Sequence, residues 1–181
     1  MSIASRTLAK INLGWNKVLL QVSSSYLYTA GYEGLAIDEF VNRLRSQCIR
    51  TVVDVRELPL SRKKGFSKNS FREHLASEGI GYVHLSALGC PKAIRDQYRI
   101  DKDWSAYTRS FVAYLASQQS SLRELAKLSR LTTVCLVCFE ADYLSCHRTY
   151  VARATNQLGA PPTLHIGART AVLDQSLRAV A

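Results

Sequence analysis

Short apolar runs alternate along the chain with stretches in which apolar residues recur every three or four positions. The runs are rich in β-branched and aromatic residues, which is typical of strands. The stretches between them are typical of amphipathic helices, as Phe40, Val41 and Leu44 illustrate. Strands that alternate with helices form βαβ units, so we predict a single α/β domain. We expect a mostly parallel, five-stranded sheet with helices on both faces.

The positions of these elements divide the chain into three parts. The predicted strands occupy residues 26–30, 50–55, 82–85, 132–138 and 163–166. Helices are predicted around residues 37–44, 70–78, 104–115, 122–128 and 146–158, and a long loop connects residues 89 and 103. We therefore expect a basic N-terminal extension at residues 1–24, an α/β domain at 25–167, and a C-terminal tail or short helix at 168–181.

The composition adds an excess of positive charge to an otherwise ordinary globular chain. Hydrophobic residues make up 47% of it, and no apolar run approaches the roughly 20 residues that cross a bilayer, so no membrane partner is expected. The five cysteines are an odd number without an evident secretory signal, which favours reduced thiols in the cytoplasm. The formal net charge of +10 predicts attraction to polyanions, with nucleic acid or a nucleotide as the partner. Alternatively, the charge serves solubility alone.

One loop concentrates this charge together with aromatic rings. Between residues 56 and 72 six basic residues stand against a single acid, Glu57. Basic groups bind phosphates and aromatic rings stack on bases, so this loop is a candidate nucleic-acid-binding surface. The residues predicted to form it are Arg62, Lys63, Lys64, Phe66, Lys68 and Arg72.

Polar side chains follow the carboxyl ends of all the predicted strands. Parallel α/β sheets bind ligands at that edge, so we expect these side chains to converge there. We predict that Glu140, Asp54, His147 and Cys138 are catalytic. The residues predicted to bind the substrate are Tyr28, Thr29, Gly31, Tyr32, Arg56, Ser61, His84, Cys146 and Arg148.

The reactive side chains are most concentrated where a buried strand ends in Cys138 and Glu140 and a helix begins at Cys146-His147-Arg148. A desolvated Glu140 suits acid–base work or nucleophilic attack, or else it pairs with an arginine. A helix N-terminus lowers the pKa of a thiol, so Cys146 is either a reactive thiolate or a packed residue beside an anion-binding Arg148.

Two further pairs of residues are interpreted from the directions in which side chains point along a strand. Asp54 and Arg56 point to the same side of a strand, either as a structural clamp or with Arg56 binding phosphate and Asp54 acting as a base. Cys135 and Cys138 point to opposite faces of their strand, so Cys135 is predicted to be a core residue and the two to form no redox pair.

We expect no metal ion and no other cofactor. The spacing of Cys138 and Cys146 is not that of a zinc ribbon or knuckle, and His147 is the one further ligand of another type close by in the sequence. A tetrahedral metal site remains an alternative if His84 or His165 completes it.

With these residues in place, the chain resembles the bacterial domain-of-unknown-function family 488 over roughly residues 26–166. Two departures are Ala30, where that family commonly has a β-branched residue, and Cys90, where it frequently has glycine. The resemblance implies a site at these positions, whereas the family name assigns no activity. The residues that carry it are Tyr28-Thr29-Ala30-Gly31-Tyr32, Val53-Asp54-Val55-Arg56 with Pro59 and Ser61, Tyr82-Val83-His84, Leu88-Gly89, and Cys138, Glu140, Cys146, His147 and Arg148.

Three functions fit these features. The leading hypothesis is a hydrolase that cleaves an N-glycosidic bond in nucleic acid or a nucleotide, as a DNA glycosylase does. The second is a thiol-dependent, rhodanese-like enzyme built on Cys138, although Glu140 and Asp142 stand in the loop that should accept an anion. The third is a nucleic-acid-binding module without catalysis. The sequence does not specify the oligomeric state.

Overall fold

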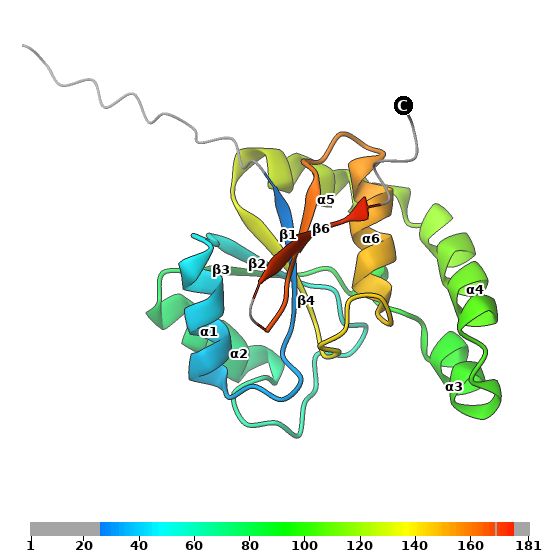
Figure 1. Cartoon of the computed structure of the whole chain (residues 1–181), viewed down its shortest axis with the longest axis horizontal. Coiled ribbons are helices and arrows are strands. Elements are labelled where there is room, and N and C mark those ends of the chain that lie inside the picture. Colours follow the sequence, from blue (N-terminus) through cyan, green and yellow to red (C-terminus); the bar gives the residue numbers. More distant parts are fainter. Residues whose placement is uncertain (1–25, 169, 176–181) are drawn as a thin grey trace, which may run out of the picture.

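The computed structural model describes residues 26–168 and 170–175, which form a sheet with helices on both faces (Figure 1). The strands are β1 (Leu27–Gly31), β2 (Thr51–Asp54), β3 (Gly81–His84), β4 (Val134–Cys138), β5 (Thr163–Ile166) and β6 (Ala171–Leu173). They lie in the order β3-β2-β4-β1-β5-β6. The first five are parallel and β6 is antiparallel to β5, so the predicted α/β class and mostly parallel sheet are confirmed.

The number of strands is a correction, because the sheet has six and not five. The sixth, β6, lies in the segment where the sequence predicts a tail or short helix. Between β5 and the antiparallel β6, the Gly167 N–H donates to the Thr170 carbonyl (2.9 Å). Three residues are too few to produce a recognisable alternation, so this strand is defined by its pairing with β5. The predicted extension at residues 1–24 lies outside the described residues.

The two faces of the sheet are covered by different helices (Figure 1). The helices are α1 (Ile37–Ser46), α2 (Lys68–Ser77), α3 (Lys92–Asp101), α4 (Trp104–Ala116), α5 (Gln119–Leu131) and α6 (His147–Asn156), with a 3₁₀ turn at Ser86–Leu88. Val52 packs with α1 and α2, whereas its neighbour Val53 packs on the opposite face with α4, α5 and α6. No helix among the described residues is both long and apolar enough to cross a membrane.

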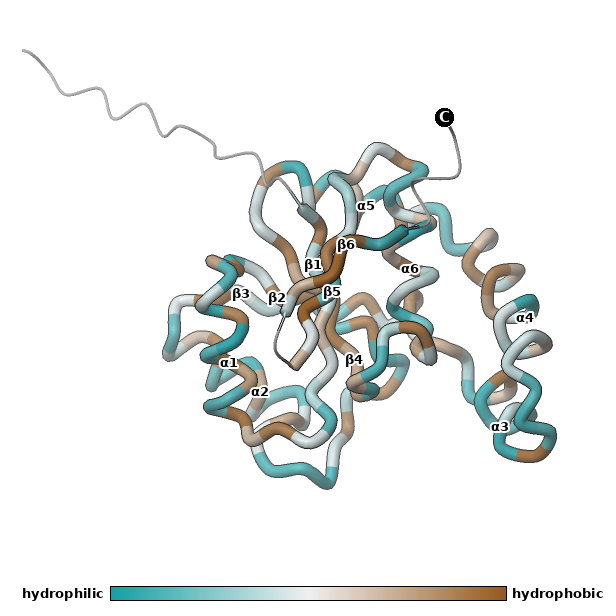
Figure 2. Tube along the Cα trace, viewed as in Figure 1, coloured by the Kyte–Doolittle hydropathy of each residue, from teal (hydrophilic) through white to brown (hydrophobic). Residues whose placement is uncertain are grey.

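Helix α3 occupies the segment where the sequence predicts a long loop, and this is a second correction. No α3 residue is fully buried and the helix is mostly hydrophilic, so its sequence lacks a wide apolar stripe (Figure 2). Asp96 instead pairs with Lys92 and Arg99, one turn away on either side, and such pairs stabilise exposed helices. Together α3 and α4 form a helical pair that flanks the carboxyl end of the sheet.

Candidate active site

Four chemically active side chains meet where β4 ends and α6 begins. Cys138 is the last residue of β4, Cys146 caps α6 and His147 starts it. The thiols of Cys138 and Cys146 donate hydrogen bonds to the same oxygen of Glu140, at 2.8 and 3.0 Å. One donor atom from each of the four residues lies within 4.8 Å of every other. We call these residues the Cys–Glu–Cys–His cluster.

The end of β2 fixes the orientation of the His147 ring. Its Nε2 lies 2.8 Å from the Val55 carbonyl, which can only accept, so Nε2 carries the proton. Nδ1 then faces the sulfur atoms of Cys138 and Cys146, at 3.6 and 4.0 Å. In the neutral ring this nitrogen offers its lone pair to the cluster.

Burial and mutual contact shift the pKa of each member of the cluster. Burial raises the pKa of Cys138, with a further contribution from its bond to Cys146. Burial also disfavours the Cys146 thiolate, but hydrogen bonds with Cys138 and His147 and the charge of Arg148 outweigh it and lower the pKa of Cys146. Burial and then the Cys146 charge raise the pKa of Glu140. Burial lowers the pKa of His147, but its bond with Cys146 and the charge there more than offset that effect and raise it.

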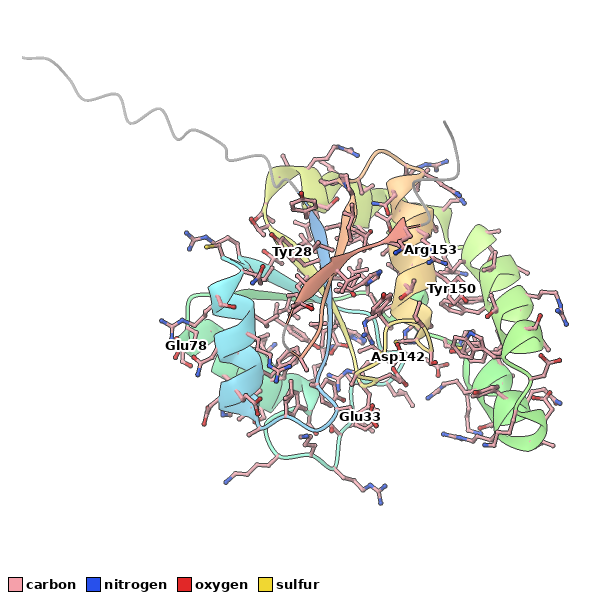
Figure 3. The ribbon with its side chains drawn as sticks, viewed as in Figure 1. Tyr28, Glu33, Glu78, Asp142, Tyr150 and Arg153 are labelled. Atoms are coloured by element: carbon pink, nitrogen blue, oxygen red, sulfur yellow. The ribbon has the colours of Figure 1, made fainter. Side chains whose placement is uncertain are left out.

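Arg148 holds the backbone that carries the cluster. This residue is 1% exposed, and its guanidinium donates to the carbonyl oxygens of Glu140 and of Ala141, the latter at 3.1 Å. From the other side, the Glu33 carboxylate accepts a hydrogen bond from the Ala141 N–H (3.0 Å), and Figure 3 shows Glu33 beside this turn. The structure therefore uses Arg148, which the sequence predicts to bind substrate, to fix the turn after β4.

Asp54 and Arg56 form a buried clamp, the first of the two interpretations that the sequence leaves open. The guanidinium donates to both carboxylate oxygens, at 2.8 and 2.6 Å, and also to the Tyr32 hydroxyl (2.7 Å) and the Phe66 carbonyl (2.9 Å). Tyr82 donates a further bond to Asp54 (2.7 Å). Asp54 is fully buried and Arg56 is 6% exposed, so these contacts occupy the groups that the alternative assigns to phosphate and proton transfer.

The other predicted substrate-binding residues lie around the cluster at different distances. Tyr32 packs against Phe66 with ring centroids 4.1 Å apart. Ser61 accepts a hydrogen bond from the Lys63 N–H within the loop between β2 and α2, which we call the basic loop. His84 bonds the Arg56 carbonyl and Lys68 and reaches no member of the cluster. Tyr28 packs among residues of the α1–α2 face. Thr29 bonds His165 on the other side of β1, so neither His84 nor His165 completes a metal site.

His165 itself makes the stability of the fold depend on pH. Burial lowers the pKa of His165 to about 4, because Arg148 and Arg153 add to the cost of a charged ring while Asp174 offsets only part of it. The other contacts of the ring that the described residues make are with uncharged groups: Tyr143, stacked at 4.0 Å, and the Thr29 hydroxyl. An unfolded chain binds this proton near pH 6.5, so stability is full above that pH and decreases as the pH falls towards 4.

We therefore expect wild-type protein to lose about 2 kcal/mol of unfolding free energy through His165 between pH 7.5 and pH 5. Denaturant titrations of the wild type and of His165→Gln at both pH values measure the contribution, because the variant lacks the titrating group. Equal losses in the two proteins would contradict the prediction.

A cavity of about 750 Å³ opens over the cluster. The basic loop forms one wall, and α3 with the start of α4 forms the other. The cluster lies at the floor beside Phe139, which is 43% exposed. The lining residues are Tyr32, Arg56, Glu57, Leu58, Leu60, Ser61, Arg62, Lys63, Cys90, Arg95, Tyr98, Arg99, Trp104, Tyr107, Cys138, Phe139, Glu140, Ser145, Cys146 and His147.

The cavity contains only part of the predicted nucleic-acid-binding surface. Arg62 and Lys63 line it, and neither forms an ion pair within residues 26–168 and 170–175. Phe66 is fully buried against Tyr32 and therefore presents no free face to a base. The remaining members of that surface, which lie outside the cavity lining, are Lys64, Lys68 and Arg72.

The opposite wall is formed by residues that are not among those predicted from the sequence. Arg95, Tyr98 and Arg99 project from one face of α3, and Trp104 follows at the start of α4. Their three- and four-residue spacing is a helical signal, which could have been recognised as a basic and aromatic face despite the absence of a buried stripe.

Comparisons with known proteins place part of the chain in a family. A family model described as "Domain of unknown function DUF488" matches residues 36–155, a range that contains the whole Cys–Glu–Cys–His cluster and both cavity walls. No curated protein and no solved structure matches the chain.

Proposed function

The chain belongs to the DUF488 family, and we propose that it is a hydrolase that cleaves an N-glycosidic bond of nucleic acid or a nucleotide in the cavity above the cluster. The observation that carries this proposal is the position of Glu140, a carboxylate at the floor of a cavity whose walls are basic and aromatic. No ion pair within the described residues engages this carboxylate, which accepts hydrogen bonds from the two thiols.

The walls suit the parts of a nucleotide. A volume of about 750 Å³ lies in the range of small-molecule sites. Arg62 and Lys63 can bind phosphate, and Phe139 and Tyr98 offer rings on which a base can stack. The sugar would then lie between the walls, above Glu140.

Glu140 supplies the chemistry that cleavage of a glycosidic bond requires. As the bond between C1′ and the base nitrogen breaks, positive charge develops on the sugar, and a nearby carboxylate stabilises it. Water adds to C1′ and gives its proton to Glu140, which passes it to the departing base. Asp54, predicted as a second catalytic carboxylate, is held by Arg56 and Tyr82 and serves in this scheme as a positioning residue.

The rhodanese-like alternative has less support from the geometry. A reactive sulfur of that kind needs N–H donors around it, whereas Cys138 lies 2.8 Å from a carboxylate oxygen and its pKa is raised by burial. A thiolate at Cys138 would face the negative charge of Glu140.

The proposal is tested by measuring free bases, by mass spectrometry, released from nucleosides, nucleotides, single- and double-stranded DNA, and RNA. We expect release by the wild-type protein, and a decrease of about 100-fold or more in Glu140→Gln, because the amide can neither accept the proton nor stabilise the sugar cation. Glu124→Gln, a change of the same kind at an exposed position on α5, is the control and should match the wild type.

Two results would count against the proposal. If no substrate releases a base while nucleic acid still binds, the chain is a binding module. If Glu140→Gln releases base as fast as Glu124→Gln does, the cleavage does not depend on the cluster.

A further inference from the structure

We infer that the Cys–Glu–Cys–His cluster is a zinc site, in which Cys138, Cys146 and His147 are the permanent ligands and Glu140 occupies the fourth, cavity-facing position. The inference does not rest on the glycosidic reaction, since it concerns what the cluster binds, but both use the Glu140 carboxylate, which can act on a substrate only while it is displaced from the ion. It goes beyond the expectation of no metal, which was based on sequence spacing alone.

The distances within the cluster are close to those of a tetrahedral site. Zn–S bonds of about 2.3 Å and Zn–N bonds of about 2.0 Å at tetrahedral angles place sulfur and nitrogen about 3.5 Å apart. In the structure, His147 Nδ1 lies 3.6 Å from Cys138 Sγ and 4.0 Å from Cys146 Sγ. The Glu140 oxygen is nearer to the sulfurs, at 2.8 and 3.0 Å, so it must withdraw by about half an ångström towards the cavity.

The orientation of His147 is independent evidence for a metal ligand. A histidine that binds metal through one ring nitrogen almost always donates the other N–H to a carboxylate, carbonyl or water. The bond from His147 Nε2 to the Val55 carbonyl is of this kind, and it leaves Nδ1 unprotonated and directed at both sulfurs. Val55 follows β2, so the neighbouring strand orients the ligand.

The surroundings hold the ligands in place before any ion binds. Cys138 is fixed by β4 and Cys146 by the N-terminus of α6, where free N–H groups favour negative sulfur. Arg148 and Glu33 fix the turn that carries Glu140 between them. The site is thus built from a rigid strand, a rigid helix and a turn bonded on both sides.

The donor set selects the metal. Two sulfurs and an imidazole favour zinc over magnesium or calcium, which prefer oxygen ligands. Two cysteines, one histidine and an exchangeable fourth position form a catalytic type of zinc site, whereas four permanent ligands form a structural one. All four residues line the cavity, but Glu140 is the one of them that is only partly buried, so a water or substrate oxygen can compete with its carboxylate there.

Metal content of the full-length protein tests this inference without any substrate. We expect one zinc per chain by elemental mass spectrometry, and a cobalt-substituted protein with the near-ultraviolet charge-transfer band of thiolate ligation. Cys146→Ser and His147→Asn should each bind zinc at least about 100-fold more weakly in competition with a chelator, a larger loss than removal of a residue that only orients a ligand would cause. Glu140→Gln should retain zinc, with lower affinity.

Cys135→Ala and Cys48→Ser are the controls, because Cys135 points to the opposite face of β4 and Cys48 is exposed. Both should bind zinc as the wild type does, and circular dichroism shows which variants are folded. Absence of zinc binding by the wild type would overturn the inference, as would unchanged binding in a folded Cys146→Ser variant. Zinc binding without base release would instead refute only the proposed function.

Discussion

The Asp54→Asn variant is expected to lose about 3–5 kcal/mol of unfolding free energy, because it leaves Arg56 charged in a buried position without its counter-ion. The fully buried carboxylate of Asp54 accepts two hydrogen bonds from the Arg56 guanidinium. Removing one partner of such a pair costs much more than the pair contributes, since the desolvated charge remains. The asparagine keeps the shape of the side chain, so the loss reports the charge together with the hydrogen bonds that its NH2 group can no longer accept.

Denaturant titration measures this effect, and the chain contains a matched surface pair. Glu39 and Arg43 form an exposed ion pair on α1, and Glu39→Gln should cost no more than about 0.5 kcal/mol. The double variant Asp54→Asn/Arg56→Met should be more stable than Asp54→Asn alone, because no buried charge is left unpaired. An Asp54→Asn variant no less stable than Glu39→Gln would show that the clamp is energetically unimportant.

The pair of Asp54 and Arg56 also shows what a sequence can and cannot reveal about this site. The two-residue spacing predicts that Asp54 and Arg56 point to the same side, and their side chains do bond each other, although β2 ends at Asp54. The sequence does not reveal the other hydrogen-bond partners of Arg56. Tyr32 and the Phe66 carbonyl come from segments that only folding brings near, so a phosphate-binding arginine and a structural one look alike in sequence. Arg148 is a parallel case, since its acceptors are backbone carbonyls.

The fold was most predictable where burial left a strong pattern. The strand at Thr163–Ile166 has the predicted bounds, and the other predicted strands differ from β1–β4 by at most two residues at each end. Helix α3 and strand β6 were missed because neither depends on a buried stripe. Ion pairs stabilise α3, and pairing with β5 defines β6. The cavity wall that α3 forms was not predicted because α3 itself was not predicted.

The Gly31→Ala variant is expected to lose about 3 kcal/mol or more of unfolding free energy and to disturb the cluster as well. A Cβ atom at this position would lie 1.8 Å from the Glu140 carbonyl oxygen and 2.5 Å from its carbon. Both are backbone atoms, and Arg148 holds the same carbonyl from the other side, so the turn cannot retreat without losing that bond. The strain therefore falls on the segment that places Glu140 between Cys138 and Cys146.

Gly81→Ala separates this effect from a general cost of replacing a strand glycine. At Gly81 in β3 the new Cβ meets Thr51 at 3.5 Å, an ordinary contact, and alanine is the better strand residue by about 0.5–1 kcal/mol. We expect Gly81→Ala to be at least as stable as the wild type and to bind zinc equally well, whereas Gly31→Ala should be less stable and bind zinc more weakly. If the two variants match in both measurements, the close approach of β1 to the turn after β4 is not what positions Glu140.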